Sequence, residues 1–112
     1  MKKYLAALLA FAFASAALAN EAHRLITAMS EEQRQKYFAF YLTRSDENCP
    51  TVSKAFYQGS DKKGAAFWNI QCTPGKSYAV QMKNDAVGSS RILDCQVLKA
   101  VNGGTCFTKF KK

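Results

Sequence analysis

Four cysteines carry most of the chemistry that this chain has available: Cys49, Cys72, Cys95 and Cys106. Structural zinc sites present cysteines about two to four residues apart, and redox pairs follow a CxxC pattern, and neither spacing occurs here. The wide spacing instead favours disulfides, for which four cysteines allow three pairings. Because a disulfide-bonded cysteine offers no thiolate, such pairing would remove the best nucleophiles and metal ligands.

The other titratable groups show no catalytic pattern. His23 is the only histidine, and no serine or cysteine nucleophile stands near it in a known motif. We expect an exposed His23 side chain rather than a general base. The acidic residues fall mostly in predicted helix starts and loops, where they bind local backbone. A carboxylate pair for glycoside hydrolysis is the alternative. We therefore expect no enzymatic activity, no cofactor and no metal site.

The first 19 residues indicate the cellular compartment in which these cysteines are located. Lys2 and Lys3 precede an apolar run over residues 4–18, which ends in the small-x-small motif Ala17-Leu18-Ala19. These features predict a signal peptide over residues 1–19. A retained membrane anchor is the alternative, although the run is shorter than the about 20 residues that span a bilayer. Cleavage would leave one domain, residues 20–112, in an oxidising periplasmic or extracellular space.

The charge of the chain favours anionic partners. It has 16 Lys and Arg against 8 Asp and Glu, and loss of residues 1–19 would lower the net charge from +8 to +6. Lipid headgroups, lipopolysaccharide, acidic glycans or an acidic protein would suit this surface, whereas export argues against nucleic acid. Simple solubility is the alternative, because the charges are scattered except for Lys109, Lys111 and Lys112.

A helix is predicted over residues 31–44. Ser30 and Gln33 form a capping box before it. Phe38, Tyr41 and Leu42 then share one face at helical spacing. Residues 21–29 favour an earlier helical turn.

The pattern changes to strands after Pro50. Candidate strands are residues 52–58, 65–71, 77–83 and 90–93, separated by the polar or glycine-rich stretches 59–64, 73–76 and 84–89. Residues 94–102 favour a short helix, with a continued strand as the alternative, and residues 105–110 favour an extended segment. The predicted fold class is α+β, with one N-terminal amphipathic helix packed on a three- to four-stranded antiparallel sheet.

Strand pairing predicts the disulfides. A hairpin loop centred between Gly59 and Gly64 pairs residues whose numbers add to about 123. Cys72 then lies opposite Thr51, close enough to Cys49 for a bridge. We predict two disulfides, Cys49–Cys72 and Cys95–Cys106.

Aromatic and basic residues recur on the predicted strands. Because neighbouring residues of a strand point to opposite faces, one sheet face packs on the helix and the other is expected to be free. A free aromatic and basic face would bind glycans or other anionic ligands. The candidate binding surface comprises Lys54, Trp68, Lys76, Tyr78 and Lys83. The alternative is that the aromatic residues form cross-strand pairs that only stabilise the sheet.

Three segments suggest a resemblance: Cys49-Pro50-Thr51-Val52, Phe67-Trp68-Asn69-Ile70-Gln71-Cys72 and Gly75-Lys76-Ser77-Tyr78-Ala79-Val80. Their order, over about residues 49–80, resembles small uncharacterised exported proteins of Gram-negative bacteria. The resemblance implies a periplasmic address and no particular activity. We expect a non-enzymatic periplasmic interaction or binding module with a surface suited to an anionic partner. The alternative is an inhibitor or immunity protein of an envelope hydrolase, acting through a protruding loop at residues 59–64 or 84–89.

Overall fold

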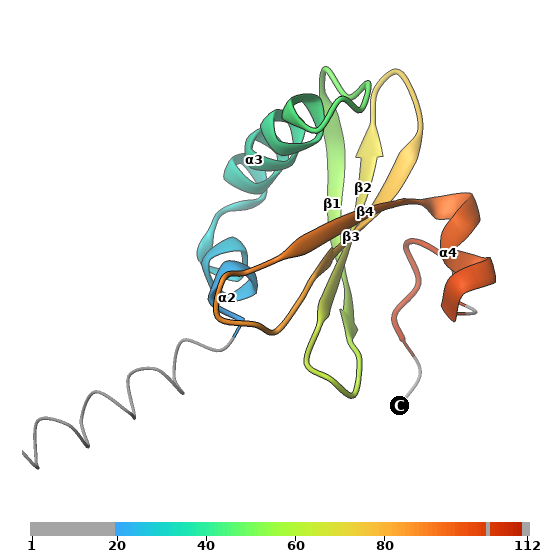
Figure 1. Ribbon diagram of the computed structural model, residues 1–112. Coiled ribbons are helices and arrows are strands. Elements are labelled where there is room, and N and C mark those ends of the chain that lie inside the picture. Colours follow the sequence, from blue (N-terminus) through green and yellow to red (C-terminus); the bar gives the residue numbers. More distant parts are fainter. Residues whose placement is uncertain (1–19, 103, 111–112) are drawn as a thin grey trace, which may run out of the picture.

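A four-stranded antiparallel sheet with helices on both faces forms the domain (Figure 1). The computed structural model describes residues 20–102 and 104–110, and the predicted signal peptide lies outside them. In chain order the elements are α2 (Glu21–Ala28), α3 (Glu31–Arg44), β1 (Val52–Ser60), β2 (Ala66–Cys72), β3 (Ser77–Met82), β4 (Ser90–Asp94) and α4 (Cys95–Asn102). The predicted α+β class is confirmed, and no helix in the described ranges is long and apolar enough to cross a membrane.

Helix α3 begins at the predicted capping box. Ser30 Oγ accepts a hydrogen bond from the Gln33 N–H at 3.2 Å, and Gln33 Oε1 accepts from the Ser30 N–H at 3.0 Å. Phe38 and Leu42, one helical turn apart, are buried against the sheet. The helical turn favoured at residues 21–29 is confirmed as a short helix, α2, which precedes α3 and adds Ile26 to the same core.

The sheet has the simple order β1-β2-β3-β4, in which each strand pairs with the next along the chain. Its register differs slightly from the prediction, since Cys72 lies opposite Val52 rather than Thr51. The register shifts twice along β1, between Val52 and Lys54 and between Tyr57 and Gly59. Such β-bulges add residues to one strand only, which a symmetric hairpin count does not foresee.

Both faces of the sheet are covered, so the expectation of a free face is wrong. The α3 face carries Trp68 and Ile70 of β2 against α2 and α3. The opposite face, here the α4 face, carries Phe67 of β2 against Leu98 of α4 and Phe110 of the C-terminal segment. In Figure 1 the sheet lies between α3 on one side and α4 on the other.

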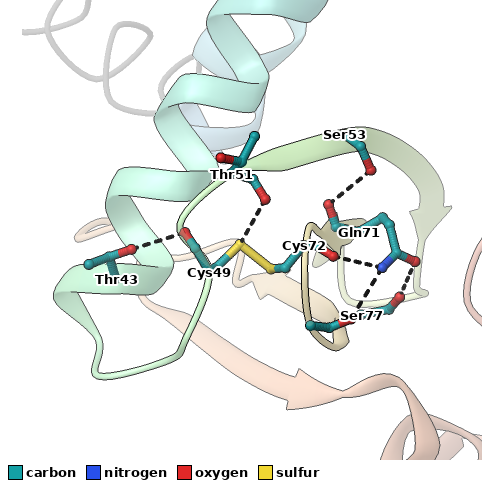
Figure 2. The surroundings of a disulfide bond; sticks show 8 residues. Thr43, Cys49, Thr51, Ser53, Gln71, Cys72 and Ser77 are labelled. Atoms are coloured by element: carbon teal, nitrogen blue, oxygen red, sulfur yellow. Dashed lines mark hydrogen bonds between the residues drawn. A yellow bond between two sulfur atoms is a disulfide. The ribbon is translucent and has the colours of Figure 1, made fainter.

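Both predicted disulfides are present. The Cys49–Cys72 bond joins the connection after α3 to the end of β2, with a Cα–Cα distance of 5.1 Å, and both cysteines are buried. Thr43 Oγ1 donates to the Cys49 carbonyl oxygen at 3.1 Å beside this bond (Figure 2). The Cys95–Cys106 bond, with a Cα–Cα distance of 5.8 Å, ties the first residue of α4 to the C-terminal segment.

The C-terminal segment comprises residues 104–110, of which residues 105–110 were expected to be extended. Instead it turns around Phe107, whose φ is +64°. The short helix expected at residues 94–102 is confirmed as α4. Because the Cys95–Cys106 bond returns the chain from α4 to the sheet, the C-terminal segment covers the rest of the α4 face.

Candidate functional site

Two residues of the predicted binding surface are buried. Trp68 is 3% exposed and Tyr78 is 6% exposed, and both belong to the core on the α3 face. They cannot contribute to an exposed binding surface, and this part of the prediction is wrong. Strand alternation was correctly inferred, but α2 and α3 cover the face to which both side chains point.

The three lysines of the predicted surface are exposed but do not form one patch. Lys76 and Lys83 flank opposite ends of β3, and Lys54 belongs to the edge strand β1. The Lys76 ammonium lies 3.5 Å from the Asp94 carboxylate, which partly neutralises it. Of these three lysines, Lys54 is the one that lies over aromatic rings, those of Phe56 and Phe107.

A different cluster, which we call the basic–aromatic strip, gathers around Lys54. It comprises Lys54, Phe56, Tyr57, Phe107 and Lys109. The Lys54 Nζ lies 5.4 Å from the ring centre of Phe56 and 5.2 Å from that of Phe107. The Lys109 Nζ lies 5.2 Å from the ring centre of Phe56 and 4.7 Å from that of Tyr57. Both lysines are exposed and the three rings are half-buried, and the two cations, which come from distant segments, share the ring of Phe56.

Two buried amides hold the C-terminal half of the strip in place. Asn69 Nδ2 donates to Gln58 Oε1 at 3.1 Å, and Gln58 Nε2 donates to the Thr105 carbonyl at 2.9 Å. Asn69 Oδ1 accepts the Phe107 N–H at 2.7 Å. Buried polar groups need partners, so these amides fix the C-terminal segment against the sheet and direct Phe107 towards Phe56.

The backbone of Phe107 is strained. A φ of +64° is unusual for a bulky residue and costs roughly 1–2 kcal/mol. The Cys95–Cys106 bond fixes the preceding residue, and Asn69 binds the Phe107 amide, so the surroundings impose this conformation. Strained residues concentrate at functional sites, which is consistent with a binding role for the strip.

The strip carries positive charge that the fold does not neutralise. In the described part of the chain, ion pairs connect carboxylates to Arg24, Arg34, Lys36 and Lys76, and none includes Lys54 or Lys109. The Lys109 ammonium donates to the Tyr57 carbonyl at 2.5 Å, which positions it without cancelling its charge.

His23 is not the exposed side chain that we expected. It is half-buried, and its Nδ1 accepts the Trp68 Nε1–H at 3.0 Å. Its ring centre lies 4.6 Å from that of Tyr57. Burial lowers the pKa of His23, which keeps the imidazole neutral and able to accept this bond. The sequence gives no signal for the contact, because 45 positions separate the two residues.

A shallow pocket of about 250 Å³ lies where β3 begins and β4 ends, lined by Lys76, Ser77, Asp94, Cys95 and Gln96. Its two titratable groups are engaged with each other, since Asp94 Oδ2 pairs with Lys76. Asp94 Oδ1 accepts the Gln96 N–H at 2.9 Å, and Cys95 is disulfide-bonded. Across residues 20–102 and 104–110, no three His, Cys, Asp or Glu side chains gather as a metal site would require.

Comparisons with protein-family models, curated proteins and solved structures give no match to this chain.

Proposed function

We propose that the protein is a non-enzymatic periplasmic binding module whose basic–aromatic strip holds an anionic partner. The observation that carries the proposal is the convergence of Lys54 and Lys109 on the ring of Phe56, with neither ammonium in an ion pair among the described residues. Hydrogen bonds between an ammonium and an anionic oxygen are about twice as strong as neutral ones. The half-buried rings add an apolar surface against which a sugar or an acyl chain can pack.

The state of the reactive groups favours binding over catalysis. All four cysteines are in disulfides, and His23 accepts a hydrogen bond from Trp68. The carboxylate in the shallow pocket is paired with Lys76. Nucleophilic or acid–base catalysis needs a group that is free to exchange a proton at the site, and these groups are committed to structural contacts.

A periplasmic location agrees with the two disulfides, which persist in oxidising compartments. The export signal predicted over residues 1–19 and the resemblance of residues 49–80 to exported proteins point the same way.

Affinity chromatography on a sulfated polysaccharide, with vesicles of an anionic phospholipid as a second probe, tests the proposal. The double variant Lys54→Gln/Lys109→Gln removes the two strip charges. The matched control Lys62→Gln/Lys63→Gln removes the same charge from the exposed β1–β2 loop. If the contact of each of the two lysines with the ligand contributes about 1 kcal/mol, the strip variant should bind the ligand about 30-fold more weakly. The affinity of the control should change little. Equal losses in both variants would show that only net charge matters.

An inhibitor role is the second candidate, favoured by the ordered β1–β2 loop. Asp61 Oδ1 accepts the N–H groups of Lys63 and Ala65 at 2.9 and 3.0 Å, and the loop projects beyond the sheet (Figure 1). A pre-organised protruding loop binds an enzyme cleft at a low entropic cost. Asp61→Ala should then weaken stoichiometric capture of an envelope hydrolase, and the strip variant should not.

A further inference from the structure

The two edges of the sheet differ in how many of their outward backbone groups are hydrogen-bonded to other parts of the chain. On the β1 edge, outward backbone groups are occupied by α3 side chains and by the C-terminal segment: Ala55 N–H by Glu31, Ser53 O by Gln35, Tyr57 O by Lys109 and Gln58 O by the Phe110 N–H. Capping of this kind prevents an edge strand from pairing with another chain. In residues 20–102 and 104–110, no backbone group on the outer side of β4 is occupied in this way.

The alternation of hydrogen bonds between β3 and β4 shows which backbone groups of β4 point away from β3. The Lys83 N–H donates to the Ser89 carbonyl at 2.8 Å, in the register that pairs Met82 with Ser90. Because hydrogen-bonded and non-bonded pairs alternate in an antiparallel ladder, the backbones of Ser90, Ile92 and Asp94 face away from β3. Asp94 directly precedes α4, and its Oδ1 accepts the Gln96 N–H as the side chain of an N-cap residue does. The carbonyl of an N-cap residue points into its helix. Among the residues that the structure describes, none binds the outward groups of Ser90 and Ile92 or the Asp94 N–H.

We propose that this edge pairs with the β4 edge of a second copy, which joins the two sheets into one antiparallel sheet. A two-fold axis at Ile92 would place Ile92 opposite its counterpart and Ser90 opposite Asp94 of the other copy. About four backbone hydrogen bonds then form, two between the Ile92 residues and two from Asp94 N–H groups to Ser90 carbonyls.

The β4 sequence is self-complementary in this arrangement. The Ser90 hydroxyl stands opposite the Asp94 carboxylate of the other copy, on the α3 face. Arg91 stands opposite Leu93 on the α4 face, so no like charges are directly opposed.

Two exposed valines are brought towards each other by the same axis. Val87 in the β3–β4 loop is 85% exposed, and Val97 on α4 is 47% exposed. They are equally spaced from Ile92 along the chain, on either side of it. The axis therefore places the β3–β4 loop of one copy at the same end of the interface as α4 of the other. Contact between Val87 and Val97 would bury apolar surface that the single copy leaves in water.

The association is expected to be weak and dependent on salt. A five-residue strand gives an interface at the small end of the range for specific complexes. The basic chains also repel each other, so added salt should strengthen pairing by screening.

Sedimentation equilibrium of the mature chain over about 10 µM to 1 mM tests the pairing. Ile92→Pro removes the outward N–H that both central hydrogen bonds require, at an edge position that tolerates proline. Ile92→Ala removes the same side chain but keeps the N–H. We expect dimers of the wild type and of Ile92→Ala, and a folded monomer of Ile92→Pro. A wild type that stays monomeric throughout, or an Ile92→Pro variant that dimerises as well as Ile92→Ala, would overturn the proposal.

Crosslinking gives a second readout that does not depend on proline. In the proposed pair, the Ile92 Cα atoms are about 5.5 Å apart, within bridging distance, whereas the Ser90 Cα atoms are about 14 Å apart. Ile92→Cys should therefore form a covalent dimer in a glutathione buffer, and Ser90→Cys should not. Equal crosslinking of the two variants, or none in either, contradicts the two-fold register.

Discussion

The buried amide of Asn69 gives the sharpest stability prediction. Asn69 is fully buried, and its two amide atoms bind Gln58 and the Phe107 N–H. Asn69→Ala would leave Gln58 Oε1 and the Phe107 N–H without those partners. Each unpaired buried polar group costs about 1–3 kcal/mol, so with two such groups the variant should lose about 2–6 kcal/mol of unfolding free energy. That is a large share of the roughly 5–15 kcal/mol typical of a domain.

Urea unfolding under non-reducing conditions, followed by the fluorescence of the buried Trp68, measures this loss. Amide hydrogen exchange supplies the local readout, because the Phe107 and Phe110 amides should exchange faster once the C-terminal segment loosens. Gln35→Ala is the control, since the Gln35 amide also makes two hydrogen bonds but lies in an exposed setting. Equal destabilisation by the two variants, or unchanged exchange at Phe107, would refute the role assigned to the buried amides.

Two further predictions concern His23 and the disulfides. Because the pKa of His23 is lowered by burial, the unfolded chain binds its proton more readily, and stability should fall as pH drops below about 6.5. Urea titrations at pH 7.5 and 5 should show this fall in the wild type and a smaller one in His23→Gln, whereas the lowered pKa values of Glu21 and Asp85 act at lower pH. Equal pH dependence of the two proteins would contradict the His23 assignment. Replacing Cys95 and Cys106 by serine should cost about 3 kcal/mol in thermal unfolding, and replacing the buried Cys49 and Cys72 should cost more. A smaller loss from the buried pair would count against this ranking.

Local sequence signals predicted the local structure well. The capping box of Ser30 and Gln33 placed the start of α3 because its contacts span only three residues. The Cys49–Cys72 bond was predicted from the β1–β2 hairpin. The prediction is correct despite the β-bulges, because a disulfide tolerates a small shift in register.

Contacts between distant residues explain the errors. Trp68 and Tyr78 were predicted to be available for binding because the sequence does not show which sheet face each helix covers. The position of Phe107 in the strip depends on the hydrogen bond that its N–H donates to Asn69, 38 positions away in the sequence. Lys109 was noted only as part of a basic C-terminal cluster, and no periodic pattern connects it with Phe56.

The central claim is that the basic–aromatic strip binds an anionic partner. NMR chemical-shift mapping tests it most directly, with a sulfated oligosaccharide titrated into the isotope-labelled mature chain at physiological salt. We predict saturable shifts at the amides of Phe56, Phe107 and Lys109, with smaller ones at Lys62 and Lys63. Shifts that are centred on Lys62 and Lys63, or spread evenly over all lysines, would contradict the claim.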